Sequence, residues 1–300
     1  MRDAGIASSA LLLVGLLLCS LLAPIAQLEE SPEARLSEDS FSVGTNQVVA
    51  VGQHHTCTIL ENSSIYCWGL NHHGQLGDGT CSNPWMGGGC PSPGSDSWSP
   101  KQIHLPDGLN ATSIAAGQHH TCAIADNGSV YCWGRGVNGE IGIGSGAGEY
   151  GQLSPRLVSL PQARSATAIS LGVTTSCAIL DDGSLYCWGS NTNGQLADEI
   201  GTGFGGNASS TPKAISLPSG RVAVDVQVGG SGTVCAILVW EPPTDDDGLL
   251  YCWGENSEGT IGDGSTSDRT TPTKIWIPHR WGVSSPSFVP QKNVPKAVNP

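Results

Sequence analysis

The chain alternates short apolar runs with turns rich in glycine and polar residues, and this pattern recurs four times. Each copy has a short apolar run ending at glycine, a cysteine-containing run, and a run that ends in Tyr-Cys-Trp-Gly. Short runs bounded by such turns predict β-strands. The tryptophans of the four copies are spaced 65, 55 and 65 residues apart, a period that predicts propeller blades or a solenoid. They are Trp68, Trp133, Trp188 and Trp253.

A further strand is predicted after each copy, which gives four strands per unit, the composition of a propeller blade. These strands are KQIHLP, PRLVSLP, PKAISLP and PTKIWIP, at residues 101–106, 155–161, 212–218 and 272–278. No such strand precedes the first unit, and one follows the last unit at residues 273–277. This surplus strand could complete the first blade and close the ring.

Ten of the eleven cysteines form pairs by position, and Cys19 stands apart in an apolar segment. The pairs are Cys57 with Cys67, Cys81 with Cys90, Cys122 with Cys132, Cys177 with Cys187, and Cys235 with Cys252. In a hairpin centred on residue 62, Cys57 lies opposite Cys67, at a separation that permits a disulfide. A zinc ribbon needs close C-x-x-C pairs, which the chain lacks. We therefore predict disulfides, with free buried thiols or a metal site as the alternatives.

The N-terminus carries 21 uncharged residues, 6–26, preceded by Arg2 and followed by an acidic stretch. This length and charge asymmetry predict a membrane anchor or a cleaved signal peptide at residues 1–27, with the rest of the chain outside the cytoplasm. An acidic linker at 28–42, a repeat domain at 43–282 and a proline-rich irregular tail at 283–300 complete the predicted organisation.

The formal net charge of −13 and the lack of a basic stripe exclude nucleic acid as a predicted partner. No nucleotide-binding, nucleophile-elbow or metalloprotease motif occurs, so we predict no enzyme activity and no cofactor. The histidine pairs at 54–55, 72–73 and 119–120 resemble metal ligands. Neighbours in a strand point to opposite faces, however, so we expect these histidines to pack and hydrogen-bond at a blade edge.

The segments GQHHTCAIADNGSVYCWG and NHHGQLGDGT resemble the repeat of the regulator of chromosome condensation (RCC1) family. The resemblance covers roughly residues 43–278 and implies a ring of four-stranded blades with ligand-binding loops at its two faces. The family usually has seven blades and this chain has four repeats, so a small closed ring, an open arc or part of an oligomer is expected. The cysteines mark a variant suited to an oxidising compartment.

The predicted function is a non-enzymatic extracellular or membrane-anchored module that binds protein or glycan partners through inserted loops. A structural surface protein that self-associates through blade edges and a hydrolase with a site at the propeller mouth are the alternatives. The candidate contact residues are aromatic side chains of the insertions, namely Trp85, Trp98, Tyr150, Phe204 and Trp240. Four glycosylation sequons begin at Asn62, Asn110, Asn127 and Asn207.

Overall fold

The structure is a computed structural model that describes residues 48–82, 94–144, 151–161, 163–199, 208–241 and 248–277. All of these residues belong to the unit formed by residues 36–300. The predicted N-terminal segment, acidic linker and irregular tail lie outside the described residues. Within the described ranges, no helix has the length and apolar character needed to cross a membrane.

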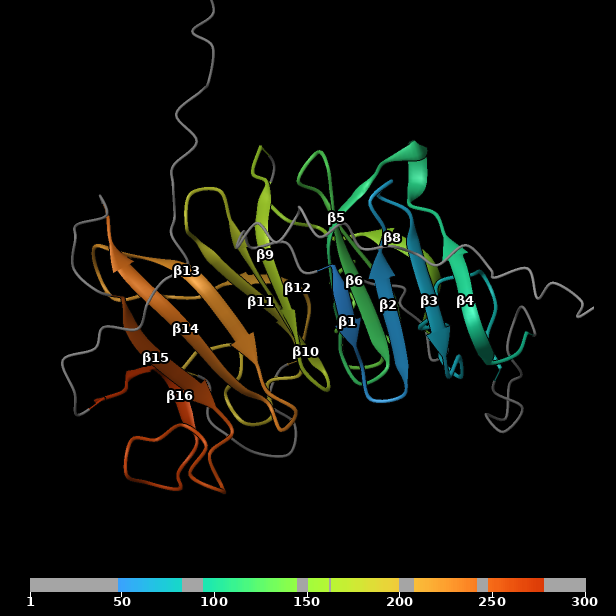
Figure 1. Cartoon of the computed structure of the whole chain (residues 1–300). Helices are drawn as coiled ribbons and strands as arrows, with labels where there is room; N and C mark the ends of the chain where they lie inside the picture. Colours follow the sequence, from blue (N-terminus) through green and yellow to red (C-terminus); the bar gives the residue numbers. More distant parts are fainter. Residues whose placement is uncertain are drawn as a thin grey trace, which may run out of the picture. The chain divides into compact units, whose positions relative to one another are not determined.

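The described residues form four antiparallel sheets of four strands each, and every sheet follows chain order (Figure 1). The predicted all-β fold with four-stranded units is therefore confirmed. The first sheet contains β1 (Val49–Val51), β2 (His55–Ile59), β3 (Ile65–Gly69) and β4 (Ser97–Ile103). The second contains β5 (Ala111–Ala116), β6 (His120–Ala125), β7 (Val130–Gly134) and β8 (Gln152–Leu157). The third contains β9 (Ala166–Leu171), β10 (Thr175–Leu180), β11 (Leu185–Gly189) and β12 (Ser209–Ala214). The fourth contains β13 (Arg221–Val228), β14 (Thr233–Trp240), β15 (Leu249–Gly254) and β16 (Arg269–Lys274).

The last strand of each sheet differs from the sequence prediction in two ways. These strands begin three or four residues before the predicted ones, and each contains a proline, as Pro100 does in β4. Proline is tolerated there because these are edge strands. The prediction that the surplus strand completes the first blade is wrong, because β16 pairs with β15 and the first sheet is completed by β4.

Successive sheets pack face to face through their first two strands. Strands β1 and β2 contact β5, β5 and β6 contact β9, and β9 and β10 contact β13. In each pairing the cysteine-bearing face of one sheet meets the tryptophan-bearing face of the next, as Cys57 meets Trp133 in the first core cluster. Trp133, Trp188 and Trp253 are completely buried in this way, whereas Trp68 of the first sheet is only partly buried.

A hydrogen-bond chain joins the first sheet to the second. The Thr121 hydroxyl donates to the backbone carbonyl of Gln75 at 2.9 Å, and Trp133 Nε1 donates to the same oxygen at 2.9 Å. His55 Nε2 lies 2.8 Å from Thr121 Oγ1. Since the single hydroxyl proton of Thr121 is already given to Gln75, His55 must donate through Nε2 and keep Nδ1 unprotonated.

The same arrangement recurs between the second and third sheets. His120 Nε2 lies 2.9 Å from Ser176 Oγ, which donates at 2.9 Å to the carbonyl of Glu140. Trp188 Nε1 donates to that same carbonyl at 2.9 Å. By the same reasoning, His120 carries its proton on Nε2. In both junctions, therefore, a hydroxyl and an indole N–H donate to one backbone carbonyl, and the histidine carries its proton on Nε2.

The junction between the third and fourth sheets has the tryptophan hydrogen bond but not the histidine and hydroxyl bonds. Trp253 Nε1 donates to the carbonyl of Gln195 at 2.9 Å, and Val234 stands where the hydroxyl residue would be. Each sheet-to-sheet junction thus contains one constant contact, an indole N–H on a backbone carbonyl in the loop of the preceding sheet. This contact gives the repeated Tyr-Cys-Trp-Gly motif its structural role.

Disulfides cross the central hairpin of every sheet. Cys57, Cys122, Cys177 and Cys235 lie directly opposite their predicted partners, and the Cα atoms of each pair are 4.1 Å apart. Cys81 is also disulfide-bonded, whereas its predicted partner Cys90 lies outside the described residues. Each bridge ties together the two strands that carry the junction residues.

Candidate functional site

A hollow of about 640 Å³ lies where the first sheet meets the second. Histidine rings dominate its lining, together with one carboxylate and one indole. The lining residues are His54, Gly69, Leu70, His72, His73, Asp96, Ser97, Trp98 and His119. All but His119 come from the first sheet and its loops, and His119 is the contribution of the second repeat.

The paired histidines divide between core and hollow at the start of a strand. His55 and His120 begin β2 and β6, point into the junctions and are buried, whereas His54 and His119 lie in the bends before these strands and face the hollow. The rings of His54 and His119 are stacked with centroids 6.3 Å apart, and His73 lies 4.9 Å from His119. Three loops of two repeats therefore bring these imidazoles together.

Burial keeps two histidines of the hollow, His73 and His119, neutral near pH 7. It lowers the pKa of His73 to about 4, with further lowering by His119, Arg135 and His72. Burial also lowers the pKa of His119, as do Arg135, His54 and His72. These rings therefore present hydrogen-bonding nitrogens and aromatic faces rather than positive charge.

Asp96 serves to hold the loops of the hollow in place. Its Oδ1 accepts a 2.8 Å hydrogen bond from the backbone N–H of Asn71 and a hydrogen bond from the Ser82 hydroxyl. Across the described ranges, no three His, Cys, Asp or Glu side chains are grouped so that they could hold a metal ion. The groups left to meet a ligand are the imidazoles and the indole of Trp98.

Trp98 stands out because it is 96% exposed. It was predicted in an inserted loop, but the structure places it in β4. Trp240, also predicted in a loop, ends β14 at 42% exposure, and the Arg221 guanidinium lies 4.3 Å from its ring centroid. That contact uses the Trp240 ring within its own sheet. The other candidate aromatics, Trp85, Tyr150 and Phe204, lie outside the described residues.

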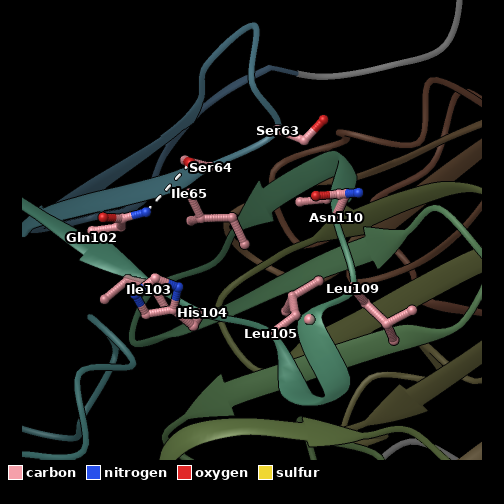
Figure 2. Close-up of a pocket in the computed structure, with 11 residues that line it drawn as sticks. Ser63, Ser64, Ile65, Gln102, Ile103, His104, Leu105, Leu109 and Asn110 are labelled. Atoms are coloured by element: carbon pink, nitrogen blue, oxygen red, sulfur yellow. Dashed lines mark hydrogen bonds between the residues drawn. The ribbon is translucent and has the colours of Figure 1, made fainter.

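A second, smaller hollow of about 280 Å³ lies between the hairpin turn of the first sheet and the connection to the second (Figure 2). Gln102 donates to the Ser64 hydroxyl at 3.3 Å across this space, and the sequon residue Asn110 lines it (Figure 2). Asn62 and Asn127 are exposed in hairpin turns, as expected for accessible sequons, and Asn207 lies outside the described residues. Its lining mixes polar side chains such as Ser63 with aliphatic ones such as Ile103 and Leu109.

Sequence reasoning assigned every histidine pair to packing, which holds for His55 and His120 only. It missed that the other members converge on one hollow. The available signal was the recurrence of His-His at equivalent positions of the first two repeats, just after the glycine that ends the first apolar run. His72 and His73 share the hollow with His119 only through the docking of two sheets, and the sequence of a single repeat does not show how sheets dock.

Comparison with known proteins agrees with the fold. The family model for the regulator of chromosome condensation (RCC1) repeat matches residues 62–124, 127–179, 182–236 and 247–292. The chain is 26% identical to the ultraviolet-B receptor UVR8 of Arabidopsis thaliana over 77% of its own length and 46% of that protein. It is also 26% identical to the probable E3 ubiquitin-protein ligase HERC4 of Homo sapiens, over 77% of this chain and 20% of that protein. The chain thus spans about half of the first relative and a fifth of the second.

Two solved structures share the fold over 77% of this chain. Human WBSCR16 superimposes with a TM-score of 0.61 at 20% identity, covering 52% of that chain. Prp20p of Saccharomyces cerevisiae superimposes with a TM-score of 0.52 at 17% identity, covering 63% of that chain, and its structure was described with its binding to Gsp1p and histones. Because four family-model matches cover most of the sequence and the sheets have the matching propeller fold, this chain belongs to the RCC1-repeat family.

Proposed function

We propose that the chain is a non-enzymatic binding module that works outside the cytoplasm and holds a protein partner at the histidine-lined hollow. The observation that carries this proposal is Trp98, which lies almost fully exposed at the rim of that hollow. Tryptophan is enriched among the residues that dominate protein–protein binding energy. Neutral imidazoles beside it supply hydrogen bonds without the desolvation cost of a buried charge.

Relatives support a protein rather than a small-molecule partner. Prp20p was described with its binding to the proteins Gsp1p and histones, and another structure contains Kap60 bound to yeast RCC1. The extracellular location rests on two further features. Disulfides in all four sheets suit an oxidising compartment, and the apolar segment at residues 6–26 has the pattern of an export signal or anchor.

Site-specific photo-crosslinking in the producing cells tests this proposal. The photo-reactive residue p-benzoylphenylalanine replaces Trp98 in the full chain, and a matched chain carries it at the exposed Trp276. We expect a protein adduct from position 98 that is absent from position 276. Excess wild-type chain should compete for this adduct, and excess Trp98→Ala chain should not.

Three outcomes would contradict the proposal. Identical adducts from both positions would show non-specific contact, and an adduct sensitive to glycosidase but not to protease would replace the protein partner with a glycan. An adduct that contains only copies of this chain would argue against a separate partner.

A further inference from the structure

The first and fourth sheets each carry half of a junction that is complete at the three internal positions. We call the surface of a sheet that carries the tryptophan its tryptophan face. In the second, third and fourth sheets this face packs on the sheet before it, and in the first sheet it packs on no described sheet. The tryptophan face of the first sheet consists of Val49, Val51, Thr56, Thr58, Tyr66 and Trp68. The loop face of the fourth sheet corresponds to the surface that receives a tryptophan in the first three sheets. It consists of Thr260, Gly262, Gly264 and Ile275.

The tryptophan face of the first sheet is exposed where its internal equivalents are buried. Val49 pairs with Thr58 as Ile114 pairs with Ala123, so Val49 and Ile114 are equivalent. Ile114 is fully buried against the first sheet, whereas Val49 is 49% exposed. This face therefore presents to solvent the apolar surface that its counterparts bury.

The same face presents two unused hydrogen-bond donors. Thr56 and Trp68 are cross-strand partners, as are Thr121 and Trp133, which both donate to one carbonyl of the preceding sheet. In the part of the chain that the structure describes, neither Thr56 Oγ1 nor Trp68 Nε1 makes a hydrogen bond. The pair is thus arranged for an acceptor that the described residues do not supply.

The loop face of the fourth sheet has the matching space and acceptor. Thr260 follows Gly259 as Gln75 follows Gly74, and the Thr260 carbonyl receives no hydrogen bond from any described residue. At Gly77, an added Cβ would lie 2.7 Å from Trp133 Nε1. At the equivalent Gly262, the nearest atom is an Ile275 methyl carbon at 3.7 Å, so the place of the indole is open.

A backbone donor of the loop face is also unpaired among the described residues. In the first junction the Gly79 N–H donates to the carbonyl of Leu153 at 2.9 Å. Gly264 occupies the position of Gly79 in the fourth sheet, and no described residue accepts its N–H.

We propose that the tryptophan face of the first sheet docks on the loop face of the fourth sheet of a second copy of this chain. Thr56 and Trp68 would donate to Thr260 of the other copy, as their counterparts do within one chain. The fourth sheet of the same copy does not make these bonds among the described residues. Two copies satisfy both faces at once, and their eight sheets lie within the range of four to eight blades known for propellers.

Sedimentation velocity of the full chain in density-matched detergent tests this docking. We expect assemblies of at least two 30.9 kDa chains that dissociate on dilution. Val49→Glu places a charge at an exposed position of the single chain but inside the proposed contact. It should weaken association by about 100-fold or more. Leu157→Glu, at a 56% exposed residue of β8 outside both faces, is the matched control and should associate normally.

Trp68→Phe provides a second variant that keeps one aromatic ring and removes the pyrrole ring with its N–H. It should weaken association by at least about 10-fold, because lost ring contacts add to the loss of one hydrogen bond. A single chain at every concentration would overturn the proposal. Association that both variants leave unchanged would also overturn it, because it would place the contact elsewhere, for example in the apolar residues 6–26.

Discussion

Lowering the pH from 7 to 5 should weaken the folded state through the two junction histidines. Burial lowers the pKa of His55 to about 4, aided by His119 and His54. Burial lowers the pKa of His120 to about 3, aided by His55, His119 and Arg135. In both rings Nδ1 is buried without a hydrogen-bond partner, so a second proton would sit in a dry site with no acceptor.

The sign and size follow from proton linkage. Both folded pKa values lie below the unfolded value of 6.5, so the unfolded chain binds more protons as the pH falls below 6.5. Stability is therefore retained above pH 6.5 and is lost as the pH falls toward 4 for His55 and toward 3 for His120. At pH 5 each histidine should cost about 2 kcal/mol of unfolding free energy.

Urea denaturation at pH 7 and pH 5 measures this loss, and His120→Gln isolates one histidine. The glutamine amide can still donate to Ser176 but does not titrate, so the variant should lose about 2 kcal/mol less than the wild type between the two pH values. The comparison cancels the contributions of all other titrating groups. Equal losses in the two proteins would refute the neutral, buried state of His120.

Three further effects should be measurable. Replacing Cys122 and Cys132 by alanine should lower the unfolding free energy by about 3 kcal/mol in urea denaturation, and a change below about 1 kcal/mol would argue against that bridge. Asn191→Ala should cost about 2 kcal/mol, because the buried amide accepts from Leu196 and donates to a carboxylate, whereas the exposed Thr192→Ala should change stability by less than about 0.5 kcal/mol. In a host that glycosylates exported proteins, the exposed Asn62 should gain a glycan, detected as a glycosidase-sensitive mass, and an unmodified Asn62 would count against export.

The sequence was sufficient to predict four strands in each unit and the register of the central hairpin. Period-two patterning and the ten-residue cysteine spacing placed Cys57 opposite Cys67, and the structure has this pairing in its hairpin. The edge strands were predicted too late in the chain because three of them were started at a proline, Pro155, Pro212 or Pro272, and the first was started directly after Pro100. Proline is excluded from central strands but tolerated in edge strands. Which strands lie at an edge is known only once the strand order is known.

The candidate site was less predictable because it forms between repeats. Trp68 and Trp133 share the same local motif, yet of the two only Trp133 is fully buried. The second sheet packs against a described sheet before it, and the first sheet does not. His54 and His119 also resemble each other locally, and their stacking depends on the docking of two sheets. Local sequence determines each hairpin, whereas inter-sheet packing determines which of its side chains remain available.

The central claim is that one junction, an indole N–H on a loop carbonyl, joins the sheets and remains unfilled at the first and fourth sheets. A mixed-isotope photo-crosslink tests it most directly. Full chains carrying p-benzoylphenylalanine in place of Trp68 are prepared light and heavy, mixed, dissociated by dilution, reconcentrated and illuminated. We predict crosslinked peptides that join position 68 to residues 259–264 and combine light with heavy halves. Crosslinked peptide pairs to residues 259–264 that are always both light or both heavy would place the contact within one chain and contradict the account. Crosslinks from position 68 to any other part of the chain would also contradict it.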